Sequence, residues 1–237
     1  MTATGEACES NKLNCADIVA KSYEYALFDD IHLALPQPDD GQGETFYTRG
    51  QFKYFHYGCD GTNDAGWGCG YRTLQTAISW IINKRSGNEA EHQPYVPSIL
   101  EIQRMLVNIG DKPKRFIGSR DWIGTLEECY VIDAMFELPC KIVNVPQLND
   151  EQVIAQISSY FKEYAGFIAM GGLSDTASKG IAGIKLGTTG VYLLIVDPHY
   201  TGVPSERQQV FDQSYVRWMH VKEFPAGAYN LCFILQK

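Results

Sequence analysis

The stretch Asp64-Ala-Gly-Trp-Gly-Cys-Gly-Tyr-Arg-Thr-Leu-Gln-Thr-Ala-Ile-Ser-Trp-Ile-Ile82 decides the fold, because in it a glycine-rich turn runs directly into an apolar helix pattern. The apolar residues that follow Cys69 recur at the spacing of one buried helix face: Leu74, Ala77, Ile78, Ile81 and Ile82. The spacing predicts a helix that begins at or near Cys69 and packs its apolar face against the rest of the fold.

Outward from this helix, three further helices and four strands are predicted. Ser98 to Glu101 and Thr125 to Glu128 have the spacing of a capping box, and Asn149 is a candidate cap for another helix. Short runs rich in β-branched or aromatic residues predict strands at 141–145, 167–170, 191–196 and 229–235. Helices come first and strands later, which favours an α+β fold with a mostly antiparallel sheet packed against the cysteine helix.

The chain is predicted to hold one domain, residues 28–237, after an N-terminal tail of residues 1–27. Its first residues are small and polar, and residues 36–44 have the composition of a loop. The small residues of Leu173–Gly190 suggest either a plain exposed connection or a flexible loop that closes over a ligand. A monomer is expected.

Composition excludes several classes of function. The 237 residues are 45% hydrophobic and 20% charged, with a net charge of −8 that argues against nucleic acid as a partner. Seven scattered cysteines without a C-x-x-C pair predict reduced thiols in the cytoplasm or nucleus and no metal site: Cys8, Cys15, Cys59, Cys69, Cys129, Cys140 and Cys232. The sequence shows neither a signal peptide nor an apolar run long enough to enter a membrane.

Cys69 is the candidate nucleophile. A helix N-terminus lowers the pKa of a thiol because the unpaired N–H groups and the helix dipole favour a thiolate there. Gly66, Gly68 and Gly70 surround the cysteine and suggest a narrow slot around its sulfur. The alternative is that Cys69 is a small buried apolar residue, as most free cysteines are.

Asp197-Pro198-His199 supplies a candidate base and its orienting carboxylate. The segment follows the apolar run Val191–Val196, where a strand leaves the core. In an extended chain, residues i and i+2 face one side about 6.6 Å apart, so both side chains can point to one place. Asp-Pro is also a common turn starter, which is the plainer interpretation. The other histidines, His32, His56, His92 and His220, lack this setting, so His199 is preferred.

An acyl-transfer site also needs hydrogen-bond donors for the oxyanion. The backbone N–H of Cys69 can supply one, and any polar group in Tyr54-Phe55-His56-Tyr57 can supply another, although tyrosines in such runs more often pack in cores. Trp67 is a candidate to cover the slot around the Cys69 sulfur. A position in the core is equally compatible with its size.

Together, Tyr57, the string from Asp64 to Thr76, Gly118-Ser-Arg-Asp-Trp-Ile-Gly124 and Asp197-Pro-His199 resemble the cysteine proteases specific for the ubiquitin-fold modifier. The similarity is to the short members of that family, without the large N-terminal domain, and covers about residues 28–237. It implies a papain-like fold, no cofactor, and a triad of Cys69, Asp197 and His199 with Tyr57 as the oxyanion tyrosine.

The resemblance further implies two reactions, maturation of the modifier precursor and cleavage of the isopeptide bond that joins the modifier's C-terminal glycine to a lysine. A glycine-ended tail fits a site lined by Trp67, Gly68, Trp122, Gly171 and Gly172. Three alternatives stay open: a deubiquitinase, a protease for the autophagy modifier, and a non-catalytic module that only binds the modifier.

Overall fold

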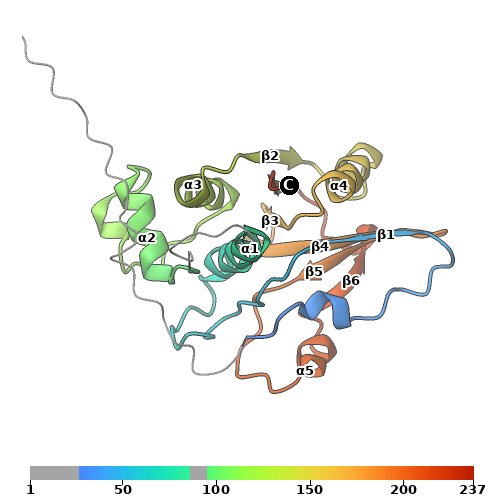
Figure 1. The fold of residues 1–237 in the computed structure, drawn as a ribbon, viewed down its shortest axis with the longest axis horizontal. Helices are drawn as coiled ribbons and strands as arrows, with labels where there is room; N and C mark the ends of the chain where they lie inside the picture. Colours follow the sequence, from blue (N-terminus) through green and yellow to red (C-terminus); the bar gives the residue numbers. More distant parts are fainter. Residues whose placement is uncertain (1–26, 86–94) are drawn as a thin grey trace, which may run out of the picture.

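A seven-stranded sheet with helices on both faces forms the frame of the molecule (Figure 1). The computed structural model describes residues 27–85 and 95–237. The strands follow the order β2 (Cys140–Val145), β7 (Tyr229–Ile234), β3 (Ile168–Gly172), β4 (Ser178–Leu186), β5 (Val191–Val196) and β6 (Val216–His220), and β1 (Glu44–Tyr47) pairs with β4. These pairings are antiparallel, so the predicted α+β class and mostly antiparallel sheet are confirmed.

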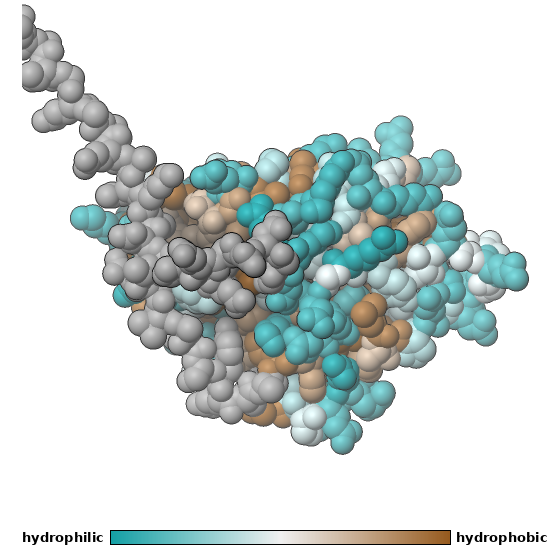
Figure 2. Space-filling view, in the orientation of Figure 1, coloured by the Kyte–Doolittle hydropathy of each residue, from teal (hydrophilic) through white to brown (hydrophobic). Residues whose placement is uncertain are grey.

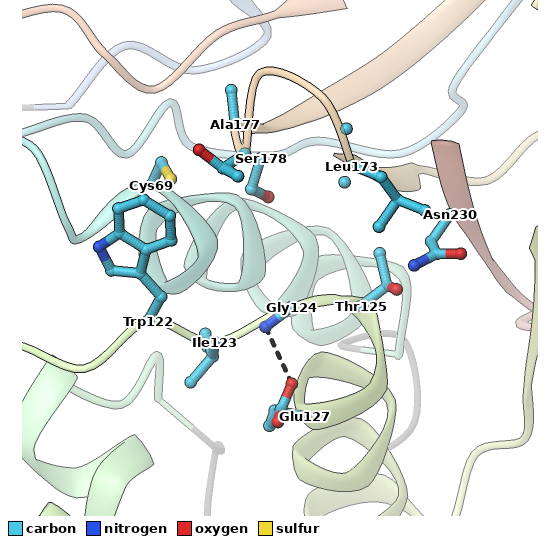
Figure 3. Close-up of a pocket in the computed structure, with 13 residues that line it drawn as sticks. Cys69, Trp122, Ile123, Gly124, Thr125, Glu127, Leu173, Ala177, Ser178 and Asn230 are labelled. Carbon is cyan, nitrogen blue, oxygen red and sulfur yellow. Dashed lines mark hydrogen bonds between the residues drawn. The ribbon is translucent and has the colours of Figure 1, made fainter. Parts of the chain in front are cut away.

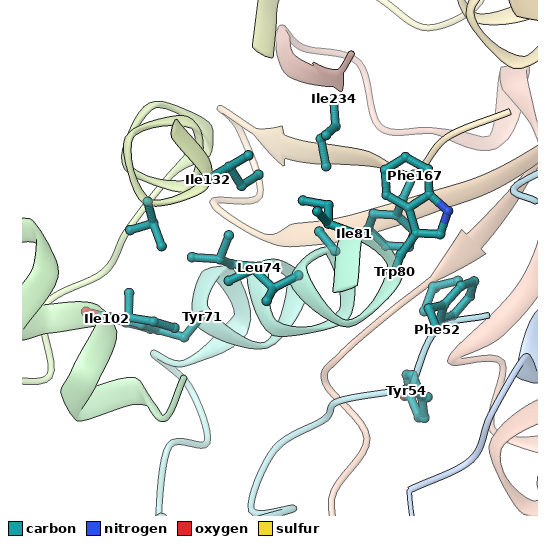
Figure 4. Close-up of a cluster of buried hydrophobic side chains, with 14 of the residues drawn as sticks. Phe52, Tyr54, Tyr71, Leu74, Trp80, Ile81, Ile102, Ile132, Phe167 and Ile234 are labelled. Atoms are coloured by element: carbon teal, nitrogen blue, oxygen red, sulfur yellow. The ribbon is translucent and has the colours of Figure 1, made fainter. Parts of the chain in front are cut away.

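The cysteine helix, α1 (Cys69–Arg85), begins at the cysteine as predicted and packs against β3 and β4. Leu74, Ala77, Ile78 and Ile81 are fully buried in its core, and Ile82 is partly buried (Figure 4). The polar residues between them are buried as well, because α2 (Ile99–Asn108), α3 (Thr125–Phe136) and the segment before α1 surround the helix. The prediction of a single buried face was therefore too narrow.

A second core lies on the other face of the sheet, under α4 (Glu151–Glu163). Alternate residues of β5 divide between the two cores because side chains of a strand alternate between faces. Leu194 and Val196 join the core of α1, whereas Leu193 and Ile195 join that of α4. The short elements complete the fold: η2 (Ile31–Ala34), η3 (Lys114–Phe116), α5 (Arg207–Asp212) and η4 (Val221–Glu223).

The start of α3 differs by one residue from the prediction. Thr125 lies inside the helix, and Gly124 is the N-cap residue. The Glu127 carboxylate accepts a hydrogen bond from the Gly124 N–H at 2.9 Å, so Glu127, and not Glu128, is the carboxylate that caps this helix. Glu128 is left free to face the interior, where it is fully buried.

The caps of the other two helices are partly as predicted. Ser98 and Glu101 form the predicted capping box of α2. Asp150, and not Asn149, caps α4, because its carboxylate accepts hydrogen bonds from the Gln152 and Val153 N–H groups.

The prediction of a loop over Leu173–Gly190 was wrong, because residues 178–186 form β4, an interior strand of the sheet that pairs with β3 and β5. A Cβ at Gly180 would collide with the Phe167 ring, and one at Gly183 would come within 2.9 Å of the Phe46 carbonyl oxygen. The small residues that suggested flexibility instead allow close packing in the sheet. The sequence also missed β1, β6 and α5.

The described part of the chain contains no helix long and apolar enough to cross a membrane. On the face shown in Figure 2, hydrophilic side chains predominate and the hydrophobic residues form small separate groups. Leu27 is buried beside Phe55 and Cys59, and the rest of the predicted tail, residues 1–26, lies outside the described residues.

Candidate active site

Cys69 is the first residue of α1, and only 8% of it is exposed. The glycines beside it are required by contacts within the protein. A Cβ at Gly68 would collide with the Asp64 carboxylate, and one at Gly70 would collide with the Ile123 carbonyl. The turn that presents the sulfur is therefore packed closely against the loop before it and the segment leading into α3.

Asp197 and His199 follow the end of β5 and meet as a pair. His199 Nδ1 and Asp197 Oδ1 are 2.5 Å apart, and the His199 backbone N–H donates to the same carboxylate oxygen at 3.0 Å. The segment is a turn and not the extended chain that was predicted, yet both side chains still face one site. Tyr54 Oη donates to the Asp197 carbonyl oxygen at 2.6 Å and helps to hold this turn in place.

The sulfur of Cys69 and the imidazole of His199 are hydrogen-bonded and shift each other's pKa. For Cys69, burial raises the thiol pKa, but the hydrogen bond with His199 and its charge bring the net pKa below the usual value. For His199, burial lowers the pKa, but Asp197 and Cys69 together raise it to about 9. The pair therefore favours a thiolate facing an imidazolium at neutral pH.

The carboxylate of Asp197 is also held in its charged form. Burial raises its pKa, but the hydrogen bonds and charge of His199, with Lys179, bring the net pKa below the usual value. Lys179 Nζ lies 3.6 Å from Asp197 Oδ2. An ionised carboxylate in this place fixes the orientation of the imidazole.

Tyr57 completes the group. Its ring packs edge-on against His199 with centroids 5.1 Å apart, and its backbone N–H donates to the Pro198 carbonyl oxygen at 3.0 Å. Burial and the neighbouring Cys69 raise the pKa of the phenol, so its hydroxyl keeps its proton. The hydroxyl hydrogen-bonds the Cys69 sulfur and lies beside the Gly66 N–H. It is thus a neutral donor at the Cys69 sulfur.

The other described histidines are either buried or hydrogen-bonded to the backbone. His32 and His56 are buried, and burial lowers the pKa of each to about 4. His220 Nδ1 accepts a hydrogen bond from the Lys222 N–H. His92 lies outside the described residues. His199 is therefore the histidine that the described structure brings to Cys69.

A cavity of about 260 Å³ opens beside the sulfur. In Figure 3, Cys69 and Trp122 lie at one end and Leu173 and Asn230 at the other. Three of the five predicted substrate-binding residues line it: Trp122, Gly171 and Gly172. Trp122 is 53% exposed, which leaves its ring available to a ligand.

The other two predicted substrate-binding residues, Trp67 and Gly68, are not among the residues that line this cavity. Trp67 donates from Nε1 to the Asn63 carbonyl oxygen at 3.2 Å and packs edge-on against Tyr71. Its partly buried ring belongs to the rim of the main core, which agrees with the packing alternative for this residue.

A buried ionic network that sequence reasoning missed supports the loop before Cys69. Arg72 Nε donates to Asp64 Oδ2 at 2.7 Å, and Arg72 Nη2 donates to Asp60 Oδ1 at 2.8 Å. Asp64 Oδ1 in turn accepts the Gly58 N–H at 2.7 Å, next to Tyr57. Arg72 and Asp64 stand in the opening string, eight residues apart, and that spacing alone does not indicate a contact.

Comparison with known proteins agrees with this geometry. The model of peptidase family C78 matches residues 43–232. "Probable Ufm1-specific protease 1" of Drosophila melanogaster is 56% identical over 220 residues, which cover 92% of this chain and 92% of that protein. "Ufm1-specific protease 1" of Mus musculus is 38% identical over 213 residues, covering 87% of this chain and 94% of that one.

A solved structure is also similar. The crystal structure of UfSP from C. elegans matches with a TM-score of 0.74 at 26% identity, over 89% of this chain and 38% of that chain. The family resemblance noted in the sequence is confirmed, as is the papain-like fold that it implied.

Proposed function

The chain belongs to peptidase family C78, and from this premise we propose that it is a thiol protease that matures the Ufm1 precursor and releases Ufm1 from conjugates by cutting after its C-terminal glycine. One observation carries the proposal. Cys69, which lines an open cavity, meets His199, Asp197 and Tyr57, with the charges that a cysteine protease needs.

Each of the four residues has a distinct role in this proposal. The Cys69 thiolate attacks the carbonyl carbon of the terminal glycine, and the negative charge moves to its oxygen, where the Tyr57 hydroxyl and the Cys69 N–H donate hydrogen bonds. The tetrahedral intermediate collapses to a thioester as the His199 imidazolium gives its proton to the leaving amine. Neutral His199 then takes a proton from water, whose oxygen attacks the thioester and frees the carboxylate and the thiolate.

The cavity suits a tail without bulky side chains near its end. Gly171 and Gly172 line the cavity, and Trp122 lies at its Cys69 end with an exposed ring (Figure 3). Backbone groups at the end of β3 can come close to a bound glycine because no side chain of their own intervenes. We propose these three residues as the tail-binding wall.

The main alternatives differ in the modifier, and sequence similarity favours Ufm1 because both relatives above carry it in their names. The non-catalytic alternative is disfavoured by the charge arrangement around Cys69. A binding module has no need of a thiol with a lowered pKa beside a histidine with a raised one.

Tail-reactive electrophilic probes of Ufm1, ubiquitin and an autophagy modifier test the proposal directly. We expect the wild-type protein to form a covalent adduct with the Ufm1 probe alone, and Cys69→Ala to form none. Cys59→Ala is the matched control, because Cys59 is a buried free thiol away from the cavity. Preference for another probe would overturn the substrate assignment, and no adduct with any probe would overturn the protease assignment.

We also propose that the protein works in the cytoplasm, with the nucleus as a second possible compartment. Five cysteines of the described residues are free thiols, which supports a reducing compartment. Imaging of the tagged full-length chain would test this, and accumulation in a secretory compartment would contradict it.

A further inference from the structure

Glu128 of α3 is a buried acid that the mechanism above does not use. It is completely buried, and one of its carboxylate oxygens, Oε1, accepts a hydrogen bond from Ser178 Oγ at 3.2 Å. The other, Oε2, has no hydrogen-bond partner among the described residues. A carboxyl group is rarely placed this way without a function, because its burial is costly.

Ser178, its partner, is the first residue of β4 and lines the cavity with Cys69. The Gly172 N–H donates to the Ala177 carbonyl oxygen at 2.9 Å, and Gly171 pairs with Ser178 next along the ladder. Because hydrogen-bonded and non-hydrogen-bonded pairs alternate in antiparallel strands, the N–H of Ser178 turns away from β3.

On its other side, the ladder between β4 and β5 begins only at Gly180 and Val196. The Ser178 N–H therefore lies beyond the end of β5, where it meets the Cys69 sulfur, and its hydrogen bond lowers the pKa of that thiol. The backbone of β4 thus contributes a donor to the nucleophile.

We propose that Glu128 is a positioning residue for the reaction, in that its carboxyl anchors the Ser178 hydroxyl and so holds the Ser178 backbone N–H on the Cys69 sulfur. The inference deepens the proposed function, since it takes Cys69 as the nucleophile. The anchor connects α3 to the first residue of β4, and α1 supplies the sulfur that the N–H meets.

The surroundings of Glu128 keep its carboxyl group neutral. An ionised carboxylate here would place a second negative charge behind the Cys69 thiolate. Burial raises its pKa to about 8, and the charge of Cys69 adds to the effect. The titratable groups that face it are Cys69 from α1, Cys140 from β2, Cys232 from β7 and Glu127 beside it on α3. Each of these is neutral or negative, so none favours the ionised form of Glu128.

The test compares Glu128→Ala, Glu128→Gln and Ser178→Ala with the wild-type protein. Asp133→Asn is the matched control, since it removes a carboxylate from the exposed side of the same helix. The first measurement is the pH dependence of Cys69 alkylation by iodoacetamide, followed by peptide mass spectrometry. The second is kcat and KM on the Ufm1 precursor, beside a thermal melt.

Glu128→Ala and Ser178→Ala should move the alkylation midpoint to higher pH and lower kcat about tenfold, the effect of one hydrogen bond, with little change in KM. Glu128→Gln should stay close to the wild type, because a neutral amide retains an acceptor oxygen. Asp133→Asn should be unchanged in both measurements.

A lowered melting temperature with an unchanged alkylation midpoint in Ser178→Ala would overturn the proposal, because it would make the contact purely structural. Equal losses in Glu128→Gln and Glu128→Ala would overturn it as well. If Glu128→Ala does not fold, Ser178→Ala decides the outcome. Because alkylation needs no substrate, a wild-type protein that fails to cut Ufm1 would overturn the proposed function and leave this test intact.

Discussion

At the scale of single residues, removing the Tyr57 hydroxyl distinguishes a catalytic role of this residue from a packing role. Tyr57→Phe keeps the ring on His199 and removes only the donor. We expect kcat on the Ufm1 precursor to fall on the order of 10²-fold with KM almost unchanged. The melting temperature should change little because the apolar burial remains. An unchanged kcat would remove Tyr57 from the oxyanion site.

The two members of the Asp197–His199 pair should differ in the loss they cause. His199→Ala removes the group that carries the proton, and we expect kcat to fall on the order of 10⁴-fold. Asp197→Asn should cost less, by roughly one to two orders of magnitude, because the carboxylate orients and stabilises the imidazole without taking its proton. Steady-state kinetics of both variants measure this, and the reverse order would contradict the assigned roles.

At the scale of elements, the Arg72 network joins α1 to the segment that carries Tyr57. Arg72→Met would leave Asp60 and Asp64 buried without their cation, and we expect a loss of about 3–5 kcal/mol in the free energy of unfolding. Urea denaturation measures it, with Arg104→Met on the exposed side of α2 as the control. Equal stability of the two variants would mean that the buried charges find compensation elsewhere.

The glycines of β4 are a second feature at the scale of elements. Gly180→Ala introduces a methyl group against the Phe167 ring, so we expect a destabilisation of about 1–3 kcal/mol. In a mobile loop the same change would be neutral or stabilising, because alanine restricts the unfolded chain. A thermal melt distinguishes the two, and a raised melting temperature would argue against β4 as an interior strand.

At the scale of the whole molecule, pH should change stability through three titratable groups of the site region. The pKa of His199 is raised to about 9, so its contribution is complete below its ordinary pKa of 6.5 and is lost as pH rises to about 9. The pKa of Glu128 is raised from 4.5 to about 8, so stability falls over that interval too. The lowered pKa of Asp197 makes stability fall in acid, below about pH 4.

We therefore expect the contribution of these three groups to the free energy of unfolding to be greatest near pH 4–5 and to decline toward pH 9. Denaturation at a series of pH values measures this profile. Glu128→Gln should flatten the part between pH 5 and 8 while leaving the His199 part in place. A wild-type profile that rises from pH 6 to 9 would contradict the assigned directions of both pKa shifts.

Features set by local spacing were predictable from the sequence. The start of α1 at Cys69, its apolar residues and the strand Val191–Val196 depend on neighbours within a few positions, which fix helix and strand periodicity. Asp197 and His199 lie two residues apart, so their meeting needed only a short turn. The family resemblance pointed to Tyr57 from its motif, although spacing alone left the other residues of its aromatic run open.

Only the tertiary structure decided which distant residues meet. Ser178 and Glu128 are 50 positions apart, and Tyr54 and Asp197 are 143 apart, so no local pattern predicts their hydrogen bonds. The same holds for β4, whose glycines suggested a loop. The groups that require these glycines are the ring of Phe167, just before β3, and the backbone of β1, and both are distant in the sequence. The sequence by itself determined the candidate nucleophile and its helix. The cavity walls and the groups behind the sulfur follow from long-range packing, which alone sets the surroundings of a buried group.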